Sequence, residues 1–295
     1  MEKFKYLKPK TIEEALCYLD ENVDEKKVIA GGTDLMVKLR RNTIDPDLII
    51  DISEIEDLKG IFRKDGFIVV GAATTLTEIA ESPLLKEYCP ILPQAAASVG
   101  AVQIRNRGTI GGNIANASPS ADTVPALVAL GAEATLMSRG QERKVSLEEM
   151  YLGPGKTLIK PNELLTSLSF PEPEGSWGGV FFKLGKRKAQ AISIVNGAVQ
   201  IRVDDTRSRF KDARIALGAV APTVLRIREA EESLMDREIS CENIKKAAEI
   251  VRSKISPITD VRATAEYRRE VSGNLFMQAV CDSLGQLGIS IPMQW

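Results

Sequence analysis

Two short stretches, each with paired glycines beside hydroxyl or amide side chains, have the composition of a phosphate-binding site. They are Val28-Ile29-Ala30-Gly31-Gly32-Thr33-Asp34-Leu35 and Thr109-Ile110-Gly111-Gly112-Asn113. Glycine lets a backbone approach a ligand closely, and successive N–H groups can then point into one concavity that binds phosphate oxygens. Paired glycines also occur in ordinary tight turns, so either stretch alone leaves that alternative open. The two together favour one shared diphosphate.

A dense polar series starts within the second glycine stretch and ends in a carboxylate. It comprises Asn113, Asn116, Ser118, Ser120 and Asp122, and an apolar segment follows directly. Asp122 is a candidate acceptor for ribose hydroxyl groups, because an ionised carboxylate accepts several hydrogen bonds. A solvated loop carboxylate is the alternative that the pattern leaves open.

The residue inventory excludes most self-sufficient catalytic chemistry. The chain has no histidine, which rules out Ser-His-Asp and Cys-His catalysis, histidine metal sites and a histidine-linked flavin. Its four cysteines form no Cys-x-x-Cys pair, so iron-sulfur or zinc ligation within this chain is not expected. No glycines have the G-x-G-x-x-G spacing, and Gly155-Lys156-Thr157 lacks the first glycine of a P-loop. A bound cofactor is therefore expected to supply the reactivity, and neither a catalytic residue nor a metal site is predicted.

Composition and charge limit the kinds of partner that can be expected for this chain. The 295 residues are 44% hydrophobic and 27% charged, with a net charge of -1, which gives no reason to expect nucleic acid. No apolar run approaches the roughly 20 residues of a membrane span, and residues 1–5 lack the apolar core of a signal peptide. We therefore expect a cytoplasmic chain without membrane contact.

Two units of secondary structure are expected to position the glycine stretches. In the first unit, a helix over 12–21, a strand over 28–30, a helix over 34–41 and a strand over 48–52 alternate. This order places the first glycine stretch at the carboxyl end of a strand, where the N–H groups of the next helix favour an anion. The second unit has hairpin signals at Asp65-Gly66 and at Gly140, with short helices between them. Thr75 and Glu78 have the spacing of a capping box.

A third unit follows Pro171-Glu172-Pro173-Glu174-Gly175-Ser176, which is the best linker in the chain. Apolar segments predict strands over 180–184, 198–203 and 213–217. The remaining pattern predicts helices over 223–235, 242–254 and 264–287, with Gly273 as a candidate break in the last of them.

The glycine stretches and Gln103-Ile104-Arg105-Asn106, in this order and separation, closely resemble the FAD-binding subunit of molybdenum hydroxylases. The family includes xanthine, nicotinate and carbon monoxide dehydrogenases. The resemblance covers nearly the whole chain and continues through Ser118–Asp122, Gly153–Lys156, Phe182-Lys183 and Leu217–Thr223.

The resemblance implies an α+β fold with two FAD-binding subdomains of the vanillyl-alcohol-oxidase (PCMH) type. The subdomains would be a small α/β subdomain at 1–56 and a larger α+β subdomain at 57–172. A C-terminal α+β domain at 173–295, of the CO dehydrogenase flavoprotein C-terminal type, would carry a three-stranded antiparallel sheet and helices.

The resemblance also implies a non-covalent FAD, with its diphosphate wrapped by Val28 to Leu35 and by Thr109 to Asn113. Four further positions match FAD-contacting positions of the family: Gly100, Asp122, Leu165 and Lys183. The family normally has an aspartate before the Ile-Ala or Ile-Ser pair of the third unit, and Gln190-Ala191-Ile192-Ser193 has none.

The implied function is electron transfer within a hetero-oligomer. Electrons from a molybdenum cofactor in a molybdopterin-binding large subunit would pass through [2Fe-2S] clusters of a small subunit to the FAD held here, and then to NAD+ or another acceptor. The subunits would form a dimer of heterotrimers. The segments Gly153–Lys156 and Val220–Thr223 look most like the purine and nicotinate branches, which favours a xanthine-dehydrogenase-like hydroxylase.

Two other functions stay open at this stage. One is a free-standing FAD oxidase of the same fold, which the lack of acid-base groups and of a separate substrate domain disfavours. The other is a nucleotide-binding interaction module without a redox role. Bound flavin that NADH reduces would argue against the module, and activity of the chain alone would argue against the subunit.

Overall fold

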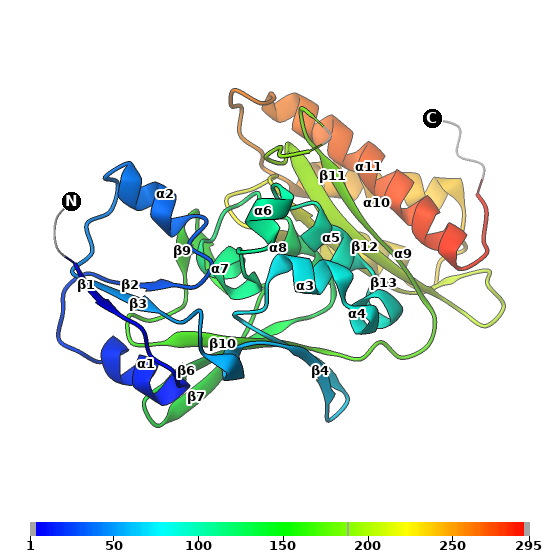
Figure 1. The fold of residues 1–295 in the computed structure, drawn as a ribbon. Helices are drawn as coiled ribbons and strands as arrows, with labels where there is room; N and C mark the ends of the chain where they lie inside the picture. The colour runs from blue at the N-terminus through cyan, green and yellow to red at the C-terminus, as the bar shows by residue number, and fades with distance from the viewer. Residues whose placement is uncertain (1–3, 188, 292–295) are drawn as a thin grey trace.

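Three β-sheets organise residues 4–187 and 189–291, the part of the chain that this computed structural model describes (Figure 1). The first sheet has three parallel strands in the order β1-β3-β2, namely Lys5–Leu7, Leu48–Asp51 and Lys26–Ile29. Parallel neighbours need crossover connections, and helices α1 (Ile12–Leu19) and α2 (Leu35–Arg40) lie in the connections. The predicted alternation is confirmed, and the first glycine stretch joins β2 to α2.

The second sheet is antiparallel, and its middle strand β10 lies between two hairpins. The order is β4-β5-β10-β6-β7, that is Ile61–Lys64, Phe67–Gly71, Leu164–Pro171, Glu133–Ser138 and Gln141–Ser146. Both predicted hairpins are confirmed, and Asp65, Gly66 and Gly140 at their turns all have positive φ angles. Hairpin turns need this left-handed conformation, which glycine adopts without strain.

Short helices connect β5 to β6 and carry the second glycine stretch. They are α3 (Leu76–Glu81), α4 (Pro83–Tyr88), α5 (Ile91–Ala97), α6 (Val102–Arg105), α7 (Ile110–Ala115) and α8 (Thr123–Ala129). The capping box at the start of α3 is confirmed, since the Thr75 and Glu78 side chains each accept from the other's backbone N–H. Two small elements complete this unit: the 3-10 helix η1 (Glu56–Leu58) precedes β4, and the hairpin of β8 (Tyr151–Gly153) and β9 (Lys156–Thr157) lies between β7 and β10 in sequence.

The third sheet has four antiparallel strands, so the prediction of three was wrong. The predicted strands are β11 (Trp177–Leu184), β12 (Val195–Val203) and β13 (Phe210–Gly218), and β14 (Leu225–Arg226) pairs with the end of β13. Helix α9 (Arg228–Leu234) therefore begins later than the predicted residue 223. Contacts with β13 decide this: β14 pairs with β13, and Glu231 of α9 accepts from the Ile215 N–H of β13 at 2.8 Å. A two-residue strand has no periodicity that could reveal such contacts.

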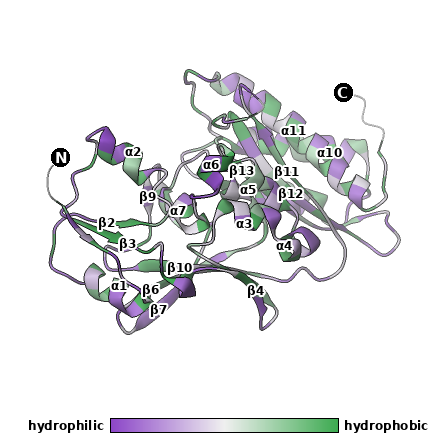
Figure 2. Ribbon diagram, in the orientation of Figure 1, coloured by the Kyte–Doolittle hydropathy of each residue, from purple (hydrophilic) through white to green (hydrophobic). Residues whose placement is uncertain are grey.

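Helices α10 (Cys241–Lys254) and α11 (Ala265–Gln286) pack on each other, and α11 also contacts β11 and β12. Figure 2 shows hydrophobic and hydrophilic residues mixed along both helices, and the buried residues of each recur with helical spacing. Helix α11 is continuous, so the candidate break at Gly273 was wrong. A Cβ at Gly273 would lie 2.5 Å from Arg252 Cζ, so the glycine makes room for α10 instead.

The second and third units share one packed core. Helix α8 contacts β12 and β13, and Ala198 and Ala216 of these strands belong to the same hydrophobic cluster as Ile68 and Leu168 of the second sheet. Within the described residues, no helix has the length and apolarity needed to cross a membrane. The shared core holds β11 and β12 in place against the helices that carry the second glycine stretch.

Glu163, directly before β10, is a buried carboxylate whose ion pair should contribute measurably to stability. Its Oε1 lies 2.7 Å from Arg143 Nε, and its side chain is 5% exposed. The Arg143 hydrogen bond holds the pKa of Glu163 below its usual value, although burial opposes this. A depressed carboxyl pKa stabilises the fold above the unfolded pKa, and this contribution is lost as pH falls through the folded pKa.

Glu163→Gln should therefore lower the free energy of unfolding by about 1.5–3 kcal/mol near neutral pH. Urea denaturation at successively lower pH checks the cause. The gap between variant and wild type should close in acid, and a gap that does not change with pH would contradict an ionic contribution.

Candidate functional site

Gly31 of the first glycine stretch contacts the two residues that directly precede the second stretch, although the stretches are far apart in the sequence. A Cβ at Gly31 would lie 1.9 Å from the Arg107 carbonyl oxygen and 2.9 Å from Gly108 Cα. Only glycine permits this approach, because any side chain would overlap the opposing backbone. Gly108 directly precedes Thr109, so the contact brings both stretches to one place.

The first stretch offers unused backbone donors. None of the hydrogen bonds within the described ranges uses the N–H groups of Gly31, Gly32, Thr33 or Asp34. Gly32 has a φ of 73°, a left-handed conformation that disfavours other residues. Successive free N–H groups between a strand and a helix bind anions, phosphate oxygens above all.

The second stretch uses its amides within the protein. Ile110 and Gly111 donate to the carbonyl oxygens of Thr74 and Ala72, and Gly112 donates to Thr109 Oγ1, which caps α7. A Cβ at Gly111 would lie 2.7 Å from Ala72 Cβ, whereas one at Gly112 would approach only Thr109 Oγ1, at 3.0 Å. Gly111 thus packs against protein, and Gly112 leaves open space on the ligand side.

Both stretches line one cavity of about 360 Å³, which we name the glycine cavity. Its walls include all of Val28 to Leu35, together with Thr109, Gly112 and Asn113. The predicted residues that do not line it are Gly100, Ile110, Gly111, Asp122, Leu165 and Lys183. Its size is in the usual range for small-molecule sites.

Several lining residues lie outside the sequence-based site prediction. They are Lys27, Lys38, Ile44, Leu76, Val99, Ile104, Gly108, Ala115, Asn116 and Gly155. Asn116 has a visible role: it donates to Asp34 Oδ1 at 3.3 Å and accepts from Lys38 Nζ at 2.8 Å, which ties α2 to the segment after α7. The sequence signal that could have added Asn116 to the predicted site was its place in the polar series from Asn113 to Asp122.

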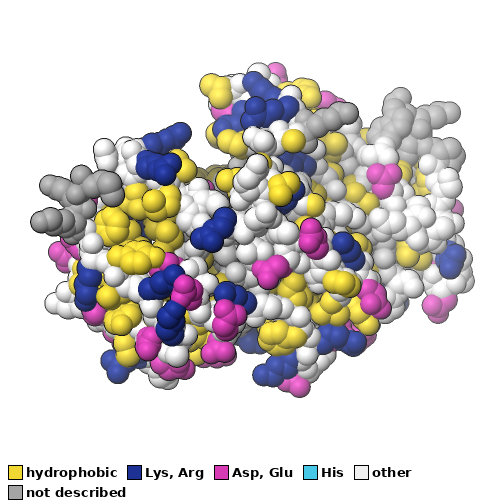
Figure 3. All heavy atoms as spheres, in the orientation of Figure 1, with side chains coloured by type: hydrophobic (Ala, Val, Ile, Leu, Met, Phe, Trp, Pro, Cys, Tyr) yellow, Lys and Arg dark blue, Asp and Glu magenta, His cyan; other side chains and the backbone are white. Residues whose placement is uncertain are grey.

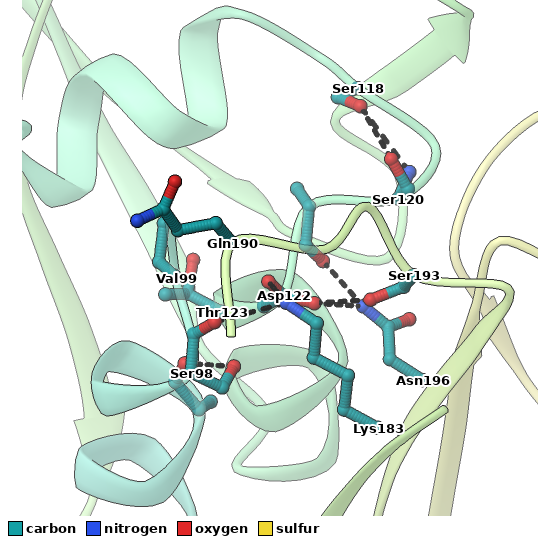
Figure 4. Close-up of polar contacts among 12 residues, drawn as sticks. Ser98, Val99, Ser118, Ser120, Asp122, Thr123, Lys183, Gln190, Ser193 and Asn196 are labelled. Carbon is teal, nitrogen blue, oxygen red and sulfur yellow. Dashed lines mark hydrogen bonds and ion pairs between the residues drawn. The ribbon is translucent and has the colours of Figure 1, made fainter. Parts of the chain in front are cut away.

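A second group of polar residues lies around Asp122, and we name Asp122, Lys183, Ser193 and Asn196 the Asp122 cluster (Figure 4). Asp122 Oδ2 accepts from Lys183 Nζ at 2.5 Å. Its Oδ1 accepts from Ser193 Oγ at 2.6 Å and from Asn196 Nδ2 at 2.8 Å. The Asp122 and Lys183 side chains are 8% and 14% exposed. A carboxylate of the second unit is thus held by three donors of the third.

The Asp122 cluster adjoins the glycine cavity by two routes. Lys183 Nζ donates to the Ser98 carbonyl oxygen at 3.0 Å, and the next residue, Val99, lines the cavity. Thr123, next to Asp122, donates to Oδ1 of the cavity residue Asn113 at 2.6 Å.

The last two predicted positions are separate from these contacts. Gly100 follows the Ser98–Val99 turn with a φ of 51°. Leu165 lies in β10 and is buried in the core of the second unit.

A larger cleft of about 1240 Å³ lies elsewhere, between the Pro173–Trp177 linker and the ends of β12 and α11. Its lining mixes the cations Arg202, Arg207 and Lys211 with carboxylates and contains none of the predicted site residues. The arrangement suited to a phosphate ligand is therefore the glycine cavity.

The site has the features of a nucleotide-binding protein, here of the α+β class. These features are free backbone amides, a glycine contact between two units, and hydroxyl and amide side chains along the cavity. Residues 2–173 match the FAD binding domain in molybdopterin dehydrogenase, and residues 180–282 match the CO dehydrogenase flavoprotein C-terminal domain. The chain belongs to the family of FAD-binding subunits of molybdenum hydroxylases, as the sequence resemblance implied. It is accordingly an oxidoreductase subunit.

Individual relatives align along almost the whole chain. It is 31% identical to the nicotinate dehydrogenase FAD-subunit of Eubacterium barkeri, covering 97% of this chain and 98% of the relative. It is 30% identical to the xanthine dehydrogenase FAD-binding subunit of Escherichia coli O157:H7, covering 96% and 97%. A solved carbon monoxide dehydrogenase from Hydrogenophaga pseudoflava, lacking the Mo-pyranopterin moiety of its cofactor, superposes with a TM-score of 0.92 at 29% identity, covering 97% and 98%. The predicted α+β fold is therefore confirmed, apart from the number of strands in the C-terminal sheet.

The residues of this chain fit the FAD that the family binds. The unused N–H groups of residues 31–34 suit a diphosphate, which has only acceptor oxygens. The space beside Gly112, which a Cβ would narrow, lets the ligand approach the backbone. The Lys183 ammonium does not line the glycine cavity but is held next to it, through the Ser98 carbonyl oxygen that precedes the lining residue Val99.

Proposed function

We propose that this chain holds FAD non-covalently and passes electrons from [2Fe-2S] clusters of a partner subunit to NAD+. The observation that carries the proposal is the contact of Gly31 with Arg107 and Gly108 beside four unused amides. Residues 28–35 would bind the diphosphate, and Thr109 to Asn113 would let it approach closely. Gly100, Asp122, Leu165 and Lys183 would surround the flavin end.

Bound FAD supplies the hydride and electron chemistry, which removes the need for a catalytic side chain in this subunit. What the chain contributes is binding, orientation and charge. The free amides hold the anionic end, and the shared core of the second and third units excludes water behind the site. Lys183, anchored by Ser98 and Asp122, keeps a positive charge at the other end.

The partner would be the [2Fe-2S] small subunit, and exposed apolar side chains around the glycine cavity support a docking face there. They lie on three elements that border the cavity: Met36 and Val37 on α2, Val102 and Ile104 on α6, and Leu152 on β8. Helices α2 and α6 carry lysine and arginine but no Asp or Glu, and β8 carries no charged residue. Figure 3 shows yellow side chains next to dark blue ones on the face around α2. An apolar patch with a cationic rim suits an acidic protein surface.

The proposals on substrate and assembly are based on the similarity of this chain to its relatives. The similarity to nicotinate and xanthine dehydrogenase subunits supports a purine or another N-heterocycle as substrate of the molybdenum-containing large subunit. A molybdopterin-binding large subunit and a dimer of heterotrimers complete the proposed assembly, in the cytoplasm.

Purified chain incubated with FAD should acquire flavin absorption bands and release intact FAD on heating. NADH should then bleach the bands, because hydride transfer from NADH reverses the proposed outflow of electrons. Anaerobic absorption spectroscopy measures both steps. A chain that stays colourless with excess FAD would contradict the proposed cofactor, and bound flavin that NADH leaves oxidised would contradict the proposed acceptor alone.

A further inference from the structure

A buried arginine, Arg268, lies behind the Asp122 cluster and contacts the segments that build it. Arg268 is near the start of α11, and its side chain is 3% exposed. Its Nη1 donates to the carbonyl oxygens of Ile194 at 2.6 Å and Ala219 at 3.0 Å, and its Nη2 donates to Asp260 Oδ1 at 2.8 Å. A guanidinium presents its donors in a rigid fork, so it holds these three acceptors in one geometry.

Two of these acceptors belong to segments that reach Asp122. Ile194 lies between Ser193 and Asn196, the two residues that donate to Asp122 Oδ1. Ala219 donates its N–H to the Pro119 carbonyl oxygen at 2.7 Å, in the segment that leads to Asp122. Arg268 therefore holds two segments that reach Asp122. Through Ile194 it fixes the segment that carries the donors Ser193 and Asn196, and through Ala219 it fixes the main chain that leads to Asp122.

The third acceptor keeps Arg268 itself in place. Asp260 also accepts from the Arg262 N–H at 2.8 Å and from its guanidinium at 2.7 Å. Burial opposes ionisation, but these hydrogen bonds hold the pKa of Asp260 below its usual value. Asp260 thus stays charged and orients the buried guanidinium, which would otherwise be free to turn away from the carbonyl groups.

We propose that Arg268 is a positioning residue for the flavin end of the site. Arg268 orders Ser193 and Asn196, these orient Asp122, and Asp122 holds the Lys183 ammonium. Two of the three N–H groups of that ammonium bond to Ser98 and Asp122, which leaves one for the ligand. This inference rests on the proposed function, since Lys183 acts on FAD only if FAD binds here.

A cation held beside the flavin favours its reduced, electron-rich form. Arg268→Lys keeps the charge but has no fork to hold three acceptors, so Lys183 becomes less well placed. Spectroscopic redox titration of the FAD-loaded full chain should show the flavin about tenfold more biased towards its oxidised form, a shift of about 30 mV for a two-electron couple. Ser193→Ala, which removes a single link and spares the buried arginine, should shift the potential in the same direction.

Two controls separate positioning from general destabilisation. Arg252→Lys also perturbs packing between α10 and α11, but Arg252 forms its hydrogen bonds with Glu249, Glu270 and Asn274, none of which belongs to the Asp122 cluster, so the potential should stay at the wild-type value. In a Lys183→Met background, Arg268→Lys should cause no further shift. Wild-type potentials in both Arg268→Lys and Ser193→Ala, or an equal shift without Lys183, would overturn the inference. Failure of the wild-type chain to bind FAD would instead overturn the proposed function.

Discussion

Gly31→Ala is expected to weaken FAD binding about 100-fold, because losing a hydrogen bond from these amides to a charged diphosphate costs about 1.5–3 kcal/mol. The new Cβ would lie 1.9 Å from the Arg107 carbonyl oxygen, so the two glycine stretches must move apart. The unused amides of the first stretch then lose their place relative to Gly112. The same overlap should cost the apo protein about 1–3 kcal/mol of stability.

Gly112→Ala is the matched variant, because it narrows the ligand's space and leaves the contact between the stretches intact. Its Cβ would approach only Thr109 Oγ1, at 3.0 Å, and alanine is a better helix former than glycine. The stability of the apo protein should therefore stay within about 1 kcal/mol of the wild type. FAD affinity should still fall at least about tenfold, since the added methyl group occupies the ligand side.

Fluorescence titration with FAD and urea denaturation of the apo protein measure the two effects independently. The two variants should differ in their effects. Gly31→Ala should lower both FAD affinity and the stability of the apo protein, whereas Gly112→Ala should lower FAD affinity alone. Wild-type affinity in Gly112→Ala would mean that FAD does not lie against α7. Wild-type affinity in Gly31→Ala would show that the contact with Arg107 has no role in binding.

Much of the fold could be predicted from local sequence patterns. Thr75 and Glu78 form the capping box that their spacing predicts, and Asp65-Gly66 and Gly140 form the predicted hairpin turns. These features depend on residues close in sequence, whose conformational preferences act directly. Strand β14 depends instead on its pairing with β13 and on the bond from the Ile215 N–H to Glu231, which no local pattern reports.

The same distinction applies to the candidate site. The glycine pairs were visible in the sequence, but that Gly31 meets Arg107 follows only from the packing of two units. Lys183 lies 61 residues from Asp122, and its selection depended on resemblance to a family rather than on spacing. The expected partner of Asp122 was a ribose hydroxyl, whereas both carboxylate oxygens accept from protein donors in the structure. Long-range polar contacts of this kind leave no periodic trace in the chain.

Asp122→Asn should destabilise the apo protein more than the loss of an exposed ion pair does. The substitution preserves shape but removes the charge that compensates Lys183, whose side chain is only 14% exposed. It also replaces one acceptor oxygen by a donor, which must face either the Lys183 ammonium or the donors of Ser193 and Asn196. Breaking one partner of a buried pair costs about 3–5 kcal/mol, because a charge stays buried without compensation.

Thermal denaturation measures this cost, and a fall in Tm of about 2–4 °C per kcal/mol is expected for a chain of this size. Glu172→Gln is the matched control: it breaks the Arg63–Glu172 pair, whose side chains are 51% and 21% exposed, and should change Tm little. Adding Lys183→Met to Asp122→Asn removes the stranded charge, so the double variant should be more stable than Asp122→Asn alone. Equal losses in Asp122→Asn and Glu172→Gln would show that the Asp122 cluster is solvated. Rescue by Lys183→Met would instead locate the cost in the uncompensated ammonium, the charge that the proposed function directs towards the flavin.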